Sequence, residues 1–155
     1  MQQRSTGSKC GHHAGGDREG DCASCVIINF MTNEGLIQFW KESAEDALNT
    51  AQELNKPGKY HHSLFFLHLA IEKIIKAVYV KKRGETPPPI HDLVRLVEDA
   101  GLPMDEERTK ELVEISSFNI SARYDDYKQQ FYKRATSEYA RRWLDIGENI
   151  FKETA

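Results

Sequence analysis

The chain has no long apolar run, no large excess of one charge and, beyond its first thirty residues, no cysteine. Its apolar runs, such as Val26–Phe30, are far shorter than the roughly 20 residues that span a bilayer. The net charge of −3 gives no general attraction for nucleic acid or acidic lipid. No secretion signal opens the sequence, so we expect a cytoplasmic protein without a membrane span.

Apolar residues recur at helical spacing from Met31 onward, and no stretch of useful length alternates in the way that is typical of strands. The sequence therefore predicts an all-α protein. Helices are predicted over residues 33–55, 60–82, 91–100, from just after Asp105, and over 136–152, with an irregular segment over 120–135. The expected fold is an up-and-down four-helix bundle, with the short helix as an addition between the second and fourth helices.

Capping residues and helix breakers mark the ends of these predicted helices. Asn33 is a candidate cap of the first helix, and the Pro57-Gly58 turn ends it. Gly84 ends the second helix, ahead of a stiff connector of three prolines. Asp92 and Asp105 are expected to cap the next two helices.

Residues 1–30 differ from the rest of the chain, because they hold all three cysteines and show no helical period. One interpretation is that residues 1–30 are a flexible segment outside the domain, and that the domain covers residues 31–155. The other is a zinc site, since four cysteine or histidine side chains complete a tetrahedron around the metal. Its candidate ligands are Cys10, Cys22, Cys25 and either His12 or His13. We expect no other cofactor.

Polar side chains lie along or beside the apolar stripe of the predicted helix over 60–82. They are His68, Glu72 and Lys76, with Lys73 nearer the solvent-exposed flank. A charge inside a helical bundle is costly, so we expect Glu72 to be partly buried and bonded to a neighbouring helix, with Arg123 as a candidate partner. His68 is either a satisfied core histidine or part of a ligand site.

The order and spacing of three segments resemble the HEPN domain family. The segments are WKESAEDALNTAQEL, the stretch from Tyr60 to Glu98 that contains the three prolines, and SARYDD before the last helix. The resemblance implies a helical bundle that commonly dimerises. It also implies one of two functions. The protein would act with a separate small nucleotidyltransferase, as its binding subunit or toxin partner, or it would cleave RNA without a metal at a site shared across the dimer.

The resemblance extends to ribonucleases of this family. Their motif is an arginine followed, after four to six residues, by a histidine. Arg123 matches the arginine, but Gln130 stands at the longest of these spacings, and Tyr132 follows two residues later. Glutamine forms hydrogen bonds but does not shuttle protons near neutral pH. The sequence therefore leans away from an enzyme, with Arg123, Gln130 and Tyr132 as the candidate catalytic residues.

The Arg123-Tyr124-Asp125-Asp126 segment resembles an element of the nucleotidyltransferase-associated branch of the family. Arg123 would pair with a phosphate and Tyr124 would stack on a base. The alternative is an Arg–Asp ion pair that fastens the loop to the bundle. The expected ligand site consists of Arg123, Tyr124, Asp126, His68, Glu72 and Lys76.

The residues and the resemblance together favour a binding and partner module that takes a nucleotide or RNA. Its expected partners are a second copy of the chain and a small nucleotidyltransferase, and no membrane. Two alternatives stay open: a metal-independent ribonuclease toxin of a toxin–antitoxin pair, and a purely structural dimerising bundle.

Overall fold

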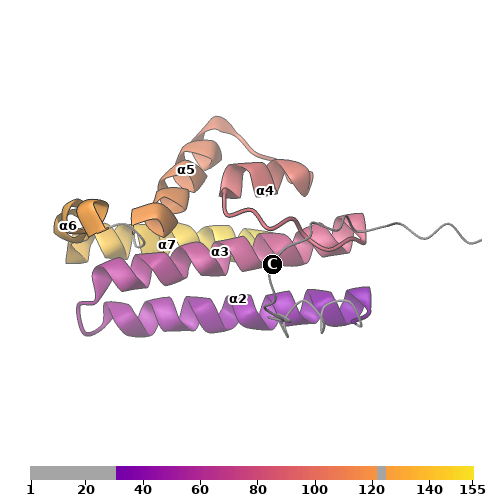
Figure 1. Cartoon of the computed structure of the whole chain (residues 1–155), viewed down its shortest axis with the longest axis horizontal. Helices are drawn as coiled ribbons and strands as arrows, with labels where there is room; N and C mark the ends of the chain where they lie inside the picture. The colour runs from indigo at the N-terminus through magenta and orange to yellow at the C-terminus, as the bar shows by residue number, and fades with distance from the viewer. Residues whose placement is uncertain (1–30, 122–124) are drawn as a thin grey trace, which may run out of the picture. The chain divides into compact units, whose positions relative to one another are not determined.

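The computed structural model of the protein describes residues 31–121 and 125–155, and residues 125–129 by their backbone alone. All regular structure in these ranges is helical, so the all-α prediction is confirmed. The helices, drawn in Figure 1, are α2 (Asn33–Asn55), α3 (Tyr60–Arg83), α4 (Leu93–Asp99), α5 (Glu106–Ser121), α6 (Asp125–Arg134) and α7 (Ser137–Thr154).

Helix α3 is the central element of the described fold, because it contacts α2, α4, α5, α6 and α7. Figure 1 shows α2, α3 and α7 running lengthwise beside one another, whereas α5 is inclined to them and the short α4 lies along α3. The predicted short helix between the second and fourth helices is thus present as α4, between α3 and α5. A regular up-and-down packing of four helices stays a prediction.

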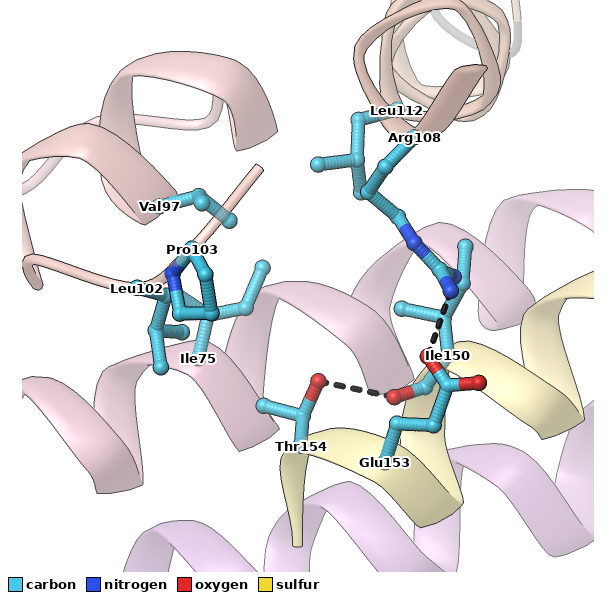
Figure 2. Close-up of a pocket in the computed structure, with 9 residues that line it drawn as sticks. All are labelled: Ile75, Val97, Leu102, Pro103, Arg108, Leu112, Ile150, Glu153 and Thr154. Carbon is cyan, nitrogen blue, oxygen red and sulfur yellow. Dashed lines mark hydrogen bonds and ion pairs between the residues drawn. The ribbon is translucent and has the colours of Figure 1, made fainter. Parts of the chain in front are cut away.

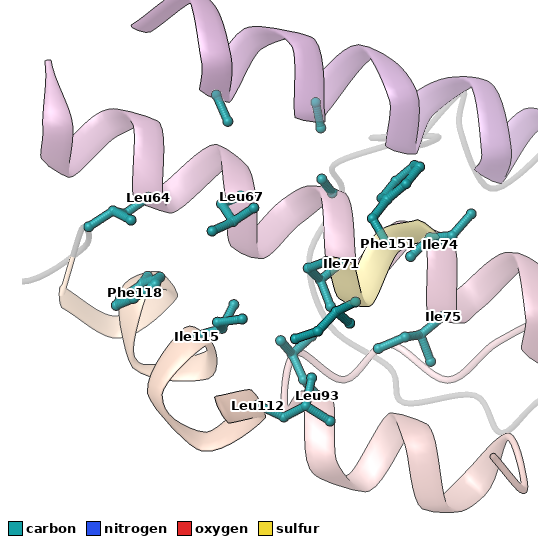
Figure 3. Close-up of a cluster of buried hydrophobic side chains, with 14 of the residues drawn as sticks. Leu64, Leu67, Ile71, Ile74, Ile75, Leu93, Leu112, Ile115, Phe118 and Phe151 are labelled. Atoms are coloured by element: carbon teal, nitrogen blue, oxygen red, sulfur yellow. The ribbon is translucent and has the colours of Figure 1, made fainter. Parts of the chain in front are cut away.

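The core forms where the apolar stripe of α3 meets its neighbours. Each large aliphatic or aromatic side chain buried there contributes about 1.5–3 kcal/mol. The side chains labelled in Figure 3 come from α3, α4, α5 and α7: Leu64, Leu67, Ile71, Ile74, Ile75, Leu93, Leu112, Ile115, Phe118 and Phe151.

Helix α2 is capped one residue earlier than the sequence predicts. The side chain of Thr32 accepts a hydrogen bond of 3.1 Å from the backbone N–H of Gly35, so Thr32 is the cap. Asn33 is instead the first helical residue, and its Nδ2 donates to the carbonyl oxygen of Gly84, 3.4 Å away. A threonine competes well for the capping position because its hydroxyl accepts a hydrogen bond as an asparagine amide does.

The predicted irregular segment over 120–135 is wrong for most of its length. Helix α5 continues to Ser121, and α6 covers Asp125–Arg134. Phe131 and Ala135 are buried in this region, while Tyr132 is exposed. With so few apolar anchors among polar residues, the sequence shows no clear helical period, and contact with α3 and α5 stabilises α6 instead.

Helix α7 packs closely on α3 at a glycine. A β-carbon built on Gly147 would lie 2.9 Å from Cγ of Leu67, which is tighter than side-chain contacts allow. Both residues are buried. The absence of a side chain at Gly147 therefore lets the two helices approach.

Within the described ranges, no helix combines the length and the apolar character that crossing a membrane requires.

Candidate functional site

A buried carboxylate forms the centre of the most polar region in the core. Oε1 of Glu72 accepts a hydrogen bond of 2.6 Å from Nζ of Lys76. Oε2 of the same carboxylate lies 3.1 Å from Nε2 of His68 and 3.0 Å from Nδ1 of His91. We call these four residues the Glu72 cluster. Helix α3 supplies three of them at successive turns, and the fourth comes from the segment that precedes α4.

The side chain of His68 is fully buried and has acceptors at both ring nitrogens. Its Nδ1 lies 3.3 Å from the carbonyl oxygen of Ile115 in α5, and its Nε2 faces the carboxylate of Glu72. Neither acceptor has a proton to offer, and a neutral imidazole carries a single N–H. The ring therefore donates to both acceptors at once only in its doubly protonated form, which links α3 to α5.

The environment of Glu72 keeps its carboxyl group ionised. Burial raises its pKa, but hydrogen bonds from His68, Lys76 and His91, together with the charge of Lys76, lower the pKa to about 2. Three charge-assisted donors outweigh the cost of desolvation, as is usual for a buried carboxylate with full partners. The cluster is thus a fixed arrangement of charge inside the fold.

Lys76 joins the Glu72 cluster to helix α2. Its Nζ lies 5.2 Å from the centre of the Trp40 ring, within the range of a cation–π interaction. Its side chain is 7% exposed, so the ammonium group is held between a carboxylate and an aromatic face. The contacts with Glu72 and Trp40 together fix the position of the Lys76 ammonium group.

His91 is the member of the Glu72 cluster that reaches solvent, since half of its side-chain surface is exposed. Because Nδ1 donates to Glu72, Nε2 points away from that carboxylate. The next residue, Asp92, caps α4 by accepting from the backbone N–H groups of Val94 and Arg95, which confirms the predicted cap. The capped turn and the carboxylate together fix the orientation of the imidazole.

A second polar group lies where α5, α6 and α7 meet. The hydroxyl of Tyr139 donates to Oε1 of Glu114, and Nη2 of Arg134 lies 3.1 Å from the same oxygen. Burial and the Glu114 carboxylate raise the pKa of Tyr139 above its ordinary value. The guanidinium of Arg134 also lies over the rings of Phe131 and Tyr139, at 5.6 and 5.5 Å.

A family model described as the HEPN domain matches residues 37–155 of the chain. The chain belongs to the HEPN domain family. The crystal structure of TT1696 from Thermus thermophilus resembles this HEPN domain with a TM-score of 0.64 at 23% sequence identity. The match covers 77% of this chain and 98% of TT1696, and it shows the common fold. A search among curated proteins found no match.

The HEPN domain brings three of the predicted ligand residues together. His68, Glu72 and Lys76 form one hydrogen-bonded group, but their side chains are buried and bond with one another. Arg123 and Tyr124 lie outside the described residues, and the side chain of Asp126 is not described. The predicted cleft that joins these two sets, including an Arg123–Glu72 bond, therefore stays a prediction.

Two of the catalytic candidates are exposed residues of α6. Gln130 lines a shallow pocket with Ser121, Phe131 and Arg134. Tyr132 is 63% exposed, and its ring packs edge-on against His61 of α3, with 5.0 Å between the ring centres. A histidine of α3 thus lies beside α6, the helix that contains Gln130.

The candidate zinc ligands Cys10, His12, Cys22 and Cys25 lie outside the described residues. The described side chains, those of residues 31–121 and 130–155, form no group of three or more His, Cys, Asp or Glu suited to a metal ion. The zinc site stays a prediction.

Sequence reasoning missed the role of His91. It placed this residue at the start of a helix, whereas α4 begins two residues later, at Leu93. The signal available was the run of three prolines, which ends the second helix and makes the chain turn back. The contact between His91 and Glu72 could not be predicted from the sequence, because it depends on how α4 packs on α3.

Proposed function

We propose that this HEPN domain is a binding and partner module that takes a nucleotide or an RNA end and works with a separately encoded nucleotidyltransferase. The observation that carries the proposal is the Glu72 cluster, which exposes the imidazole of His91 to solvent and holds the ammonium group of Lys76 on the other oxygen of the same buried carboxylate. Lys76 offsets the charge of Glu72, so the buried carboxylate does not repel an anionic group next to Nε2 of His91.

In this proposal the buried residues support the ligand site and the exposed ones contact the ligand. Glu72 holds His91 in place, and His68 and Lys76 hold Glu72. Nε2 of His91 would face a phosphate oxygen of the ligand. Arg123 would pair with the phosphates, and Tyr124 would stack on the base, with Asp126 nearby.

Thermal unfolding with added ligand tests the binding half of the proposal. ATP, GTP and a twelve-nucleotide single-stranded RNA serve as probes. A ligand at about 100 times its Kd stabilises the folded state by about 2.7 kcal/mol, so the melting temperature should rise by several degrees. Arg123→Ala and His91→Ala should each reduce the rise, whereas Arg141→Ala, which removes an exposed charge from α7, should not. No rise with any probe contradicts nucleotide binding.

The partner half is tested by the neighbouring gene and by co-purification. A small nucleotidyltransferase encoded next to this chain should form a complex with it when the two are expressed together. We also propose a homodimer, because Val113 and Ile120 lie two turns apart on α5 and are each 57% exposed. Light scattering should then give twice the mass of the chain, and Val113→Glu with Ile120→Glu should halve it.

The ribonuclease alternative is favoured by the position of His61 beside Tyr132 of α6. In such a reaction a base takes the proton of a ribose 2′-hydroxyl, the oxygen attacks phosphorus, and the P–O5′ bond breaks as an acid protonates the leaving oxygen. RNA incubated with the protein and a chelator should then yield 2′,3′-cyclic phosphate ends, and Arg123→Ala or His61→Ala should abolish them. A purely structural bundle would neither cleave RNA nor gain stability from any probe.

A further inference from the structure

A small pocket lies between the last turn of α7, the first turns of α5 and the link from α4 (Figure 2). Its walls are mainly apolar, and an ion pair between Arg108 of α5 and Glu153 of α7 lies beside it. The apolar lining consists of Ile75, Val97, Leu102, Pro103, Leu112 and Ile150. Helices α3, α5 and α7 all contribute to this lining, so the pocket lies at the edge of the packed core.

The volume of this pocket limits what can occupy it. The cavity measures about 140 Å³. Pockets for drug-sized molecules and cofactors measure roughly 300–1,000 Å³. A space of this size suits one aliphatic side chain, such as leucine or methionine, in the way that anchor residues fill pockets at protein interfaces.

The surface beside the pocket is acidic. An adjoining shallow pocket shares Arg108 and Glu153 with it. Four carboxylates line this second pocket against the single guanidinium of Arg108: Asp105, Glu107, Glu111 and Glu153. The guanidinium already pairs with Glu153 and Glu111, which leaves Asp105 and Glu107 uncompensated by it. An anionic ligand is therefore disfavoured here, and cationic groups are favoured.

We propose that this apolar pocket and its acidic rim form a docking site for a basic segment of a protein partner. One aliphatic side chain of the segment enters the pocket, and flanking Lys or Arg side chains face Asp105 and Glu107, with which the guanidinium of Arg108 does not pair. The charge complementarity selects this occupant over a nucleic acid or an acidic membrane, both of which the rim repels.

The docking site shares no residue with the proposed nucleotide site, although Ile75 in its lining lies within one turn of Glu72 on α3. Arg108 lies in the first turn of α5 and Ser121 ends that helix, so roughly 20 Å of helix separate the acidic rim from the end of α5. A partner bound at the acidic end would leave the other end of α5 open. The inference thus extends the proposed partner role without depending on nucleotide binding.

Selection from a displayed library of random twelve-residue peptides, on the full chain and without nucleotide, tests the inference. Enriched peptides should combine Lys or Arg with an aliphatic residue. The best peptide, made synthetically, should bind at least ten times more weakly to Glu107→Lys with Glu153→Lys. Its affinity should also fall as salt increases. The matched control, Glu45→Lys with Glu138→Lys, reverses two exposed charges elsewhere and should bind normally.

A second variant tests the pocket itself and guards against loss of folding in the charge reversal. Thr154 lines the pocket in the last turn of α7, where Thr154→Phe should fill it and also weaken binding at least tenfold. Circular dichroism checks that each variant is folded. The inference is overturned if no peptide is enriched, if the winners lack basic residues, or if they bind all variants equally. It is also overturned if the charge reversal dissociates a dimer, since the occupant is then a second copy.

Discussion

Nδ1 of His91 lies 3.0 Å from Oε2 of Glu72, although the two residues are 19 positions apart in the chain. The bond fastens the segment that follows the three prolines to the middle of α3. It also connects the buried carboxylate to the surface, because His91 is half exposed and Glu72 is 6% exposed. The stability of the fold and the orientation of the candidate site therefore depend on the same carboxylate.

Replacing Glu72 by alanine should destabilise the protein far more than replacing its neighbour Lys73. Glu72→Ala leaves Lys76 and His68 buried without their common partner, a loss that typically costs about 3–5 kcal/mol. Lys73 makes one long contact of 3.4 Å to the carbonyl oxygen of Ser43 and is partly exposed, so Lys73→Ala should cost under about 1 kcal/mol. Urea unfolding of both variants measures the difference. Equal free energies of unfolding for the two variants would show that Glu72 is not held as the structure has it.

The stability contributed by Glu72 should disappear in acid. Its pKa falls from 4.5 to about 2 on folding, so the folded state favours the ionised form. The stabilisation is complete above the unfolded pKa and is lost as the pH falls from about 5 to 2. At about 1.4 kcal/mol per pH unit, the loss amounts to about 3 kcal/mol.

The comparison of the parent chain with Glu72→Gln isolates this contribution. The free energy of unfolding, measured in urea at several pH values, should fall more steeply for the parent between about pH 5 and 2. Parallel curves for the two proteins would mean that other carboxylates account for the acid sensitivity.

Adding one methyl group at Gly147 should destabilise the protein. Alanine is the better helix former by about 1 kcal/mol, but its β-carbon would meet Leu67, and overpacking of this kind costs about 1–3 kcal/mol. We expect Gly147→Ala to lower the melting temperature, whereas Asp145→Ala, exposed on the same helix, should leave it nearly unchanged. In a Leu67→Ala background the same substitution should become neutral or stabilising. Additive effects of the two changes would contradict a direct clash.

Tyr139 should lose its proton only at unusually high pH. Burial and its hydrogen bond to Glu114 raise its pKa, so the folded state retains the proton after the unfolded chain has released it. The resulting stabilisation is present below about pH 10, the ordinary tyrosine pKa, and is lost as the pH rises above it. In an absorbance titration of the folded protein, Tyr139→Phe should therefore remove only the late part of the tyrosine ionisation. A loss of signal near the ordinary tyrosine pKa would contradict the shift.

The sequence predicts the long helices well because their apolar stripes are continuous. The bounds Asn33–Asn55 of α2 agree with the prediction, and α3 extends it by one residue. Helix α6 was not predicted, because Phe131 is its main anchor and its other described side chains are polar or exposed. Its helical state depends on contact with α3 and α5, which a single sequence does not reveal.

The candidate site was predictable only in part, for a similar reason. The spacing of His68, Glu72 and Lys76 along one helix places them at successive turns, and this local geometry follows from the sequence. The contact of Glu72 with His91 and that of Lys76 with Trp40 join different elements. Such contacts depend on packing between helices, so no local pattern indicates them.

The turn between α2 and α3, with Gly58 at a φ of +81°, brings two long helices together with only a few intervening residues. The contacts nearest this turn have low sequence separation and cost little loop-closure entropy, so the pair should begin to assemble there early and act as the folding nucleus. Helices α4 to α7 would then dock on a preformed template. Lengthening the turn at Gly58 should therefore slow folding more than lengthening the proline connector by the same number of residues.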